Sequence, residues 1–324
     1  MTKLSIIVPI YNVEPYIGIC LRSILGTTAS SESFEVIVVN DGTPDRSMTI
    51  VREICADHKN VRLIEQDNQG LSAARMNGAA IAQGDYIWFV DSDDWLKENA
   101  VHTVLQMIEQ IHPDVLITPL HWRFPDSAKD YVDINLTANK CCTGKDCLSN
   151  SISPAWAAQR FIFRKELLEN KWLYFPLNTL HEDEYFGRVL LYSADSVYVL
   201  VESLYNYRQR ENSIMSNITI KSGYDLIAIY RLLTLFLAQE VCMEDRQWFR
   251  RNIFEDVLIV SYCRCMPVLE KPEFNKFILK YRWHIVAEYI KSKPSKSFKK
   301  ILGDICFILF PYKYSRFREL RYIQ

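Results

Sequence analysis

Acidic residues follow an apolar stretch near residue 90 of this 324-residue chain. The sequence reads Tyr86-Ile-Trp-Phe-Val90 and then Asp91-Ser92-Asp93-Asp94, so a run typical of a buried strand ends in carboxylates. Two carboxylates one residue apart offer the hard oxygen ligands that Mg²⁺ and Mn²⁺ prefer. Such an ion can neutralise a departing diphosphate, which predicts a metal site at Asp91 and Asp93. The alternative is an acidic turn that caps a helix beginning near Glu98.

A second acidic cluster, His181-Glu182-Asp183-Glu184, precedes an amphipathic run from Tyr185 to Tyr192. Carboxylates at a helix start interact favourably with the helix dipole, and this alone explains the cluster. In the functional interpretation, one of them is a general base that takes the proton of an attacking hydroxyl. The local sequence leaves both interpretations open.

Asp41 ends a second apolar run, Phe34-Glu-Val-Ile-Val-Val39, in the sequence Asn40-Asp41-Gly42. An acid at this place commonly binds the ribose of a dinucleotide, so a dehydrogenase is a rival interpretation. That fold requires a glycine-rich turn after the first strand, whereas Pro9-Ile-Tyr-Asn-Val-Glu14 contains no glycine. The dehydrogenase interpretation therefore fails, and Asp41 is either a nucleotide ligand or a turn residue.

Two groups of basic residues could bind phosphate. Asn68-Gln-Gly70 opens a helix that carries Arg75, and a helix N-terminus together with a planar guanidinium attracts anions. Arg208, Arg210 and Ser213 belong to a second group that could close over a diphosphate. For the first group taken alone, an ordinary N-terminal turn with a solvated arginine is the preferred interpretation. For the second group, a surface charge cluster explains the residues equally well.

Strand and helix patterns alternate along the first hundred residues. Apolar β-branched runs separated by helical stretches imply crossover connections and a mostly parallel sheet, so we predict an α/β fold. Ligands of such sheets bind beyond the carboxyl ends of the strands, where Asp41 and Asp91–Asp94 lie. The expected strands are 4–10, 34–39, 61–65, 85–90 and 114–118, and the expected helices are 15–25, 47–58, 71–82 and 98–111.

The chain is expected to be loop-rich from 123 to 153 and to begin a helix near Arg164. Beyond residue 217 apolar residues recur at helical spacing over 224–241, 248–262 and 274–290. We therefore predict two domains, an α/β domain at 1–215 and a helical C-terminal region at 216–324.

The composition excludes several classes of protein. A formal net charge of -1 gives no basic field for nucleic acid. The nine cysteines are irregularly spaced, which predicts reduced thiols in a cytoplasmic protein rather than a zinc site. The short run Leu4–Ile10 predicts a first strand and not a secretion signal, and no apolar run is long enough to span a bilayer.

Taken together, five segments resemble the family 2 glycosyltransferases, which have the GT-A fold. The resemblance covers roughly residues 3 to 215, and the order and spacing of the segments make it specific. The segments are Ser5-Ile-Ile-Val-Pro-Ile-Tyr-Asn12, Val38-Val-Asn-Asp-Gly42, Asn68-Gln-Gly-Leu-Ser-Ala-Ala-Arg75, Gly84-Asp-Tyr-Ile-Trp-Phe-Val-Asp-Ser-Asp-Asp94 and His181-Glu-Asp-Glu-Tyr185.

The resemblance implies inverting transfer of a sugar from a nucleotide donor, with UDP-hexose or UDP-N-acetylhexosamine favoured. It implies that Asp93 binds Mn²⁺ or Mg²⁺ with Asp91 in support, that Asp183 rather than Glu182 is the base, and that Arg210 steadies the diphosphate. The remaining donor-binding residues that it implies are Pro9, Tyr11, Glu14, Asp41, Asn68, Arg75 and Ser92.

Two positions depart from the family pattern. The family usually has Asn directly after the helix arginine, where this chain has Met76. The family often reads Trp-Asn-Lys where this chain reads Trp156-Ala-Ala-Gln159. That segment shapes the acceptor side, to which we assign Trp156 and Glu184.

Nine basic residues lie in the tail 291–324 and flank the apolar stretch Ile301–Tyr312. This pattern suits an anionic membrane surface, and family members that build surface polysaccharides commonly use lipid-linked glycan acceptors. A helix packed on its own domain is the alternative. For the whole chain, the rival functions are a nucleotide-sugar-binding subunit without turnover and a nucleotidyltransferase, which lacks its glycine-rich phosphate loop here.

Overall fold

The computed structural model describes residues 2–133, 141–149, 156–210, 220–253, 257 and 271–292, together with residues 305 and 309. The chain divides into two compact units, residues 1–211 and 212–324. The boundary predicted near residue 215 lies outside the described residues.

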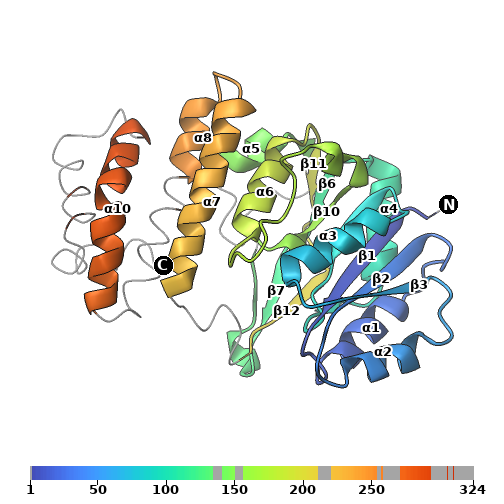
Figure 1. Ribbon diagram of the computed structural model, residues 1–324. Coiled ribbons are helices and arrows are strands. Elements are labelled where there is room, and N and C mark those ends of the chain that lie inside the picture. The colour runs from blue at the N-terminus through green and yellow to red at the C-terminus, as the bar shows by residue number, and fades with distance from the viewer. Residues whose placement is uncertain are drawn as a thin grey trace. The chain divides into compact units, whose positions relative to one another are not determined.

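A large sheet of eight strands forms the centre of the first unit (Figure 1). Four neighbouring pairs are parallel (β1–β2, β2–β3, β1–β4 and β6–β11) and three are antiparallel (β4–β10, β6–β10 and β9–β11). The predicted α/β class with a mostly parallel sheet is therefore confirmed. In spatial order the strands are β3 (Val61–Gln66), β2 (Phe34–Asp41), β1 (Leu4–Ile10), β4 (Tyr86–Phe89), β10 (Phe161–Arg164), β6 (Val115–Ile117), β11 (Val197–Val199) and β9 (Cys141–Cys142).

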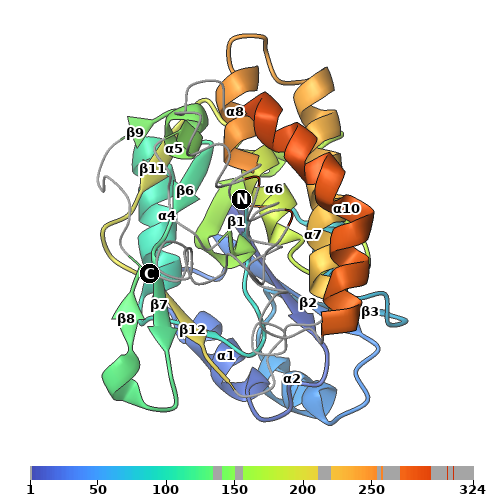
Figure 2. The same ribbon diagram turned by 90° about the vertical axis from the view of Figure 1, so that its left-hand side faces the viewer.

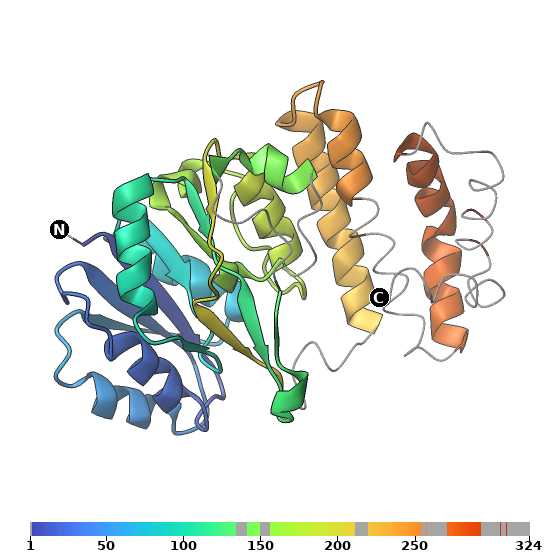
Figure 3. The ribbon, with the colours of Figure 1, turned by 180° about the vertical axis from the view of Figure 1, so that it is seen from behind.

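Helices cover both faces of this sheet, which explains why every residue of β1 is buried. Leu4, Ile6 and Val8 of β1 join a core with α1 (Ile17–Leu25), α2 (Ser47–Cys55) and α4 (Ala100–Ile111). Ile7 points to the other face, where it lies so close to Gly78 of α3 (Leu71–Ile81) that a Cβ there would be 2.5 Å away. Figure 3 shows the molecule from behind, with α4 in front of the sheet.

The helix α6 (Asp183–Tyr192) lies on the same side of the large sheet as α3 (Figure 1). Its Phe186 stacks on Phe175 with ring centroids 4.0 Å apart and also contacts Phe89 and Phe163 of the sheet. This aromatic core fixes the N-terminus of α6, and hence its acidic residues, near the carboxyl end of β4. The short helix α5 (Gly144–Ser149) packs against α6.

A second, smaller sheet was not predicted from the sequence (Figure 2). Its strands are β5 (Trp95–Leu96), β12 (Tyr205–Arg208), β7 (Leu120–Arg123) and β8 (Tyr131–Val132), in that spatial order. Since β5 directly follows Asp91–Asp94, the sheet begins at the predicted metal site.

The helix predicted to begin near Arg164 is present only as a short 3-10 helix, and the strand before it was not predicted. Arg164 ends β10, and only the short 3-10 helix Lys165–Glu169 follows. The residues Phe161-Ile-Phe are buried between β4 and β6 and pair antiparallel with both strands, so sheet packing determines their conformation. Short 3-10 helices also span Ser127–Lys129 and Ala158–Arg160.

The second unit is helical where it is described, which confirms the predicted helical C-terminal region. Its helices are α7 (Ile220–Gln239), α8 (Arg246–Ile253) and α10 (Lys271–Ser292). The hydroxyl of Tyr230 on α7 donates to Glu288 of α10 at 3.0 Å. None of the helices in the described part combines the length and apolarity needed to cross a bilayer. Most of the tail 291–324, to which membrane binding is assigned, lies outside the described residues.

Candidate active site

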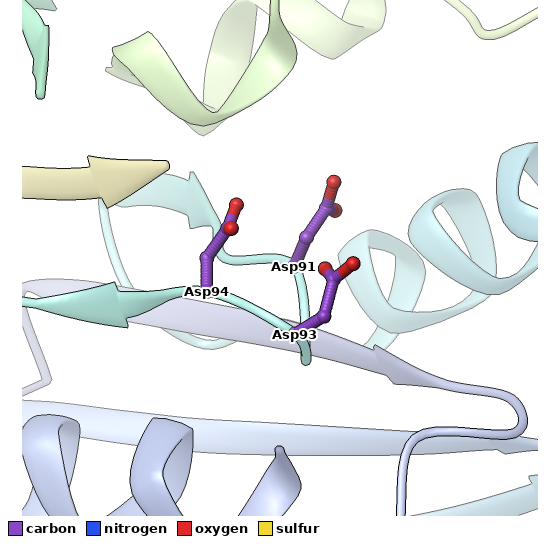
Figure 4. A group of neighbouring side chains, drawn as sticks. All are labelled: Asp91, Asp93 and Asp94. Atoms are coloured by element: carbon purple, nitrogen blue, oxygen red, sulfur yellow. The ribbon is translucent and has the colours of Figure 1, made fainter. Parts of the chain in front are cut away.

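The loop after β4 brings three carboxylates together. Ligand oxygens of Asp91, Asp93 and Asp94 all lie within 4.8 Å of one another, and the side chains point to the same side of the loop (Figure 4). Both oxygens of Asp94 accept hydrogen bonds from the protein, one from the backbone amide of Arg208 and one from the hydroxyl of Tyr205, each at 2.7 Å. Asp94 therefore anchors the loop, while Asp91 and Asp93 are the more accessible pair.

The electrostatics of this loop fit a divalent cation. Burial raises the pKa of Asp93, and the charge of Asp91 raises it further, against a lowering by Arg210. Burial and the same two neighbouring aspartates raise the pKa of Asp94 well above its ordinary value. Crowded carboxylates resist ionisation because their charges repel one another. A hard cation bound to their oxygens would stabilise the ionised form.

Arg75 joins the metal loop to the acidic N-terminus of α6. Its Nη2 donates to Asp91 at 2.9 Å, and its Nη1 donates to Glu182 at 2.9 Å and to Asp183 at 3.1 Å. The side chain is 1% exposed, and its guanidinium lies 5.1 Å from the ring centroid of Phe175. Although burial lowers the pKa of Arg75, the three carboxylates raise it above its ordinary value. The predicted contact of Arg75 with a nucleoside stays a prediction.

Asp183 lies in the first turn of α6, and Glu182 is the N-cap residue. Burial raises the pKa of Asp183 well above its ordinary value; Arg75 lowers it, and Glu182 and Asp91 raise it. The backbone amide of Ala158 also donates to Asp183. The side chain of Asp183 is 23% exposed and that of Glu182 is 11% exposed, so Asp183 is the easier carboxylate for a substrate to reach.

The two residues assigned to the acceptor side are linked through Arg188. Glu184 pairs with Arg188 one helical turn further on, at 2.6 Å. The guanidinium of Arg188 is buried and lies 4.2 Å from the ring centroid of Trp156. Both Trp156 and Glu184 are buried in this contact, so the structure supplies them with a packing role, and their acceptor role stays a prediction.

The loops after β1, β2 and β3 hold one another at the predicted nucleoside end. The Asp41 carboxylate accepts from the Gln66 side chain and from the amides of Gln69 and Gly70 at 2.7 to 2.9 Å. Asn68 donates to the Asp41 carbonyl at 3.1 Å. Asp41 thus organises the turn before α3, and its contact with a ribose stays a prediction.

The other residues predicted at this end belong to the same loops. Tyr11 follows β1 and is 51% exposed, and Pro9 lies within that strand beside Val39 of β2. Glu14 accepts from the backbone amide of Arg46 at 3.1 Å. Ser92 is buried within the loop after β4.

Two arginines at the end of β12 reach the metal loop. Arg210 pairs with Asp93 at 2.9 Å, and the Nε of Arg208 donates to the Asp93 carbonyl at 2.7 Å. Both guanidinium groups lie over the ring of Tyr16, at 5.4 and 5.0 Å. The arrangement brings Arg210 to the predicted metal ligand, whereas Ser213 lies outside the described residues.

Sequence reasoning assigned no role in this site to three of its residues: Asp94, Tyr205 and Gln159. The side-chain amide of Gln159 donates to Asp91, on the oxygen that Arg75 does not use. Gln159 comes from the segment Trp156–Gln159 that departs from the family pattern, and this departure was the available signal. Tyr205 lies 111 residues from Asp94 along the chain, and no local pattern indicates their contact.

Comparison with known proteins identifies the domain that carries this site. Residues 5–171 match the family described as Glycosyl transferase family 2. The chain is 37% identical over 217 residues to the uncharacterized glycosyltransferase EpsJ of Bacillus subtilis (strain 168). That alignment covers 65% of this chain and 62% of EpsJ, so less than two thirds of the relative is matched.

Two solved structures have a similar fold. TarS 1-349 of S. aureus in complex with UDP-GlcNAc gives a TM-score of 0.63 at 19% identity, covering 97% of this chain and 92% of that one. The mannosyltransferase PcManGT of Pyrobaculum calidifontis, in complex with GDP-Man and Mn²⁺, gives 0.54 at 15% identity, covering 93% and 87%. At these identities the likeness establishes the fold alone, and it confirms the predicted GT-A type.

Proposed function

The chain belongs to glycosyl transferase family 2, and we propose that it transfers one sugar from a nucleoside diphosphate donor to a hydroxyl of a glycan acceptor. The observation that carries this proposal is the pair of linked acidic groups: Asp91 and Asp93 at the end of β4, and Asp183 joined to them through Arg75. Such a transfer is assisted by a base for the acceptor hydroxyl and by a cation that stabilises the departing diphosphate, and the two acidic groups could supply the base and the cation ligands.

Asp93 and Asp91 would hold Mn²⁺ or Mg²⁺, which supplies positive charge to the departing diphosphate when bound. Arg210 lies beside Asp93 and can contact the same phosphates through its planar donor fork. The fold neighbours whose structures contain UDP-GlcNAc or GDP-Man and Mn²⁺ support this choice of ligands. UDP-hexose or UDP-N-acetylhexosamine is the donor class that we favour.

Asp183 would be the general base. Its carboxylate accepts the proton of the acceptor hydroxyl as that oxygen bonds to the anomeric carbon and the bond to the diphosphate breaks. A raised pKa makes it a stronger base, and the contact with Arg75 fixes its orientation. A single displacement from the face opposite the diphosphate inverts the configuration at that carbon.

The acceptor that we propose is a growing surface glycan, attached to a lipid and met at the inner face of the cell membrane. The basic tail 291–324 supports this location by its charge, since six lysines and three arginines accompany two acidic residues, Asp304 and Glu319.

The test is a panel of nucleotide sugars, each incubated with the protein with and without Mn²⁺ and scored for release of free nucleotide. We expect one or two donors to release nucleotide in a metal-dependent way, and chelation with EDTA to stop the release. If UDP binds with the metal and no donor is ever turned over, the chain is a nucleotide-sugar-binding subunit and the proposed activity is wrong.

A further inference from the structure

Three aromatic side chains form a row across the smaller sheet. Tyr207 of β12 pairs with Trp122 of β7, and Trp122 pairs with Tyr131 of β8, so the three are direct cross-strand neighbours. Trp122 and Tyr131 are stacked with centroids 5.7 Å apart and an angle of 6° between their planes. Tyr207 meets Trp122 edge-on at 4.7 Å. Since adjacent strands are about 4.8 Å apart, the row extends over roughly 10 Å.

The inner end of the row lies beside the candidate active site. Residues two apart on a strand face the same side of a sheet, so Tyr207 shares a face with Tyr205, whose hydroxyl donates to Asp94. Burial raises the pKa of Tyr207, and the charges of Asp94, Asp91, Asp93 and Asp183 raise it further. The aromatic row therefore begins next to the base and the metal loop.

The outer end of the row is open to solvent. Tyr131 is 49% exposed, and Tyr207 and Trp122 are partly exposed. The row therefore runs from the candidate active site to the surface. An extended substrate would have to follow such a path, because only its end reacts.

A buried ion pair holds the middle ring in place. The indole nitrogen of Trp122 donates to Asp133 at 3.1 Å, and the same oxygen of Asp133 accepts from Arg160 at 2.5 Å. Arg160 is 4% exposed and belongs to the 3-10 turn whose Ala158 amide contacts Asp183. The same 3-10 turn thus fixes the positions of Asp183 and Trp122. This arrangement favours a ligand that contacts both residues at once.

Two arginines near the row are paired with carboxylates. Arg160 is paired with Asp133, and Arg123 is paired with Asp130 at 3.0 Å. Because these two arginines of the described residues are neutralised, they favour an uncharged ligand at the row over a phosphate. The predicted nucleoside-binding residues Tyr11 and Asp41 lie at the ends of β1 and β2 in the large sheet, whereas the row lies on the smaller sheet.

We infer that Tyr207, Trp122 and Tyr131 form the acceptor subsite, on which uncharged sugar rings of the glycan stack before the terminal hydroxyl reaches Asp183. Sugar rings present apolar C–H faces, which pack on aromatic rings, and the length of the row matches about two sugar units. The inference rests on the proposed sugar transfer and adds the chemistry of its acceptor.

The test uses the full chain, UDP and Mn²⁺ on a printed array of bacterial surface glycans with neutral and phosphate-bearing members. We expect wild-type protein to bind neutral glycans, Tyr131→Ala to weaken that binding by about fivefold to tenfold, and Tyr131→Phe to retain it. Trp283→Ala, which removes an aromatic residue that is 64% exposed in the second unit, is the matched control and should bind like the wild type. Melting curves verify that each variant is folded.

The inference is overturned if Tyr131→Ala binds like the wild type, if binding is confined to phosphate-bearing glycans, or if no glycan is bound while UDP still is. Failure of the proposed function looks different, because then the wild type releases no nucleotide from any donor in the separate donor assay.

Discussion

Arg75 donates to Asp183 at 3.1 Å although the two residues are 108 positions apart in the sequence. The same guanidinium compensates Asp91 and Glu182, so its removal leaves three carboxylates facing one another in a largely buried place. Arg75 therefore holds the acidic residues of the site together, in addition to its predicted role in binding the donor.

Replacing Arg75 by Met should therefore lower the free energy of unfolding by about 3 to 5 kcal/mol, the usual effect of breaking a buried ion pair from one side. Chemical denaturation followed by tryptophan fluorescence measures this change. Arg52→Met is the matched control, because Arg52 pairs with Glu65 at 2.8 Å and both side chains are about 60% exposed. The control should change stability by about 0 to 1 kcal/mol. Equal effects of the two substitutions would contradict the importance of the buried contact.

Asp183→Asn should preserve the shape of the site and remove the proton acceptor. We expect kcat to fall by roughly 10² to 10⁴, the usual contribution of a general base, while the affinity for UDP with Mn²⁺ stays close to that of the wild type. Initial rates and calorimetric titration measure the two quantities. Glu182→Gln is the comparison, since Glu182 contacts the same nitrogen of Arg75 and is less exposed. A larger loss of kcat in Glu182→Gln would transfer the role of base to that residue.

The rate should depend on pH with a definite sign. Asp183 must be ionised to accept a proton, and burial raises its pKa well above its ordinary value. Hence kcat should fall as the pH is lowered, with a midpoint above the value of about 3.9 that an exposed aspartate shows. Because Arg75 lowers this pKa, Arg75→Met should shift the midpoint to higher pH. Profiles of kcat between about pH 5 and pH 8 test both statements. An unshifted midpoint in the variant would show that Asp183 does not control the rate.

The local part of this architecture could be predicted from the sequence. The strand Tyr86–Phe89 is apolar and is followed at once by Asp91–Asp94, so the strand and its acidic loop were visible together. The same is true of Asp41 at the end of β2 and of the acidic residues at the start of α6. Each of these features depends on neighbours within a few positions.

The long-range part could not be predicted in this way. The strands β5, β7, β8 and β12 have only two to four residues each, which is too short for a recognisable periodicity. The contact of Tyr205 with Asp94 depends on pairing between these strands. Likewise no strand was predicted at β10, because its strand conformation comes from burial between β4 and β6.

Mn²⁺ should stabilise the protein, and more strongly at neutral than at acid pH. Because the pKa values of Asp93 and Asp94 are raised, their contribution to the stability of the metal-free protein is present at low pH and is lost as the pH rises through those values. At neutral pH the ionised aspartates repel one another, and a bound cation relieves this repulsion. At a concentration about 100 times its Kd, the cation adds about 2.7 kcal/mol to the free energy of unfolding. For a domain of this size we expect Tm to rise by roughly 5 to 10 °C. Differential scanning fluorimetry with Mn²⁺, and then with excess EDTA, measures the shift.

Asp93→Ala should abolish this rise in Tm, whereas Glu109→Gln, which changes a carboxylate in an exposed pair with Lys3, should not. An undiminished shift in Asp93→Ala would place the cation elsewhere.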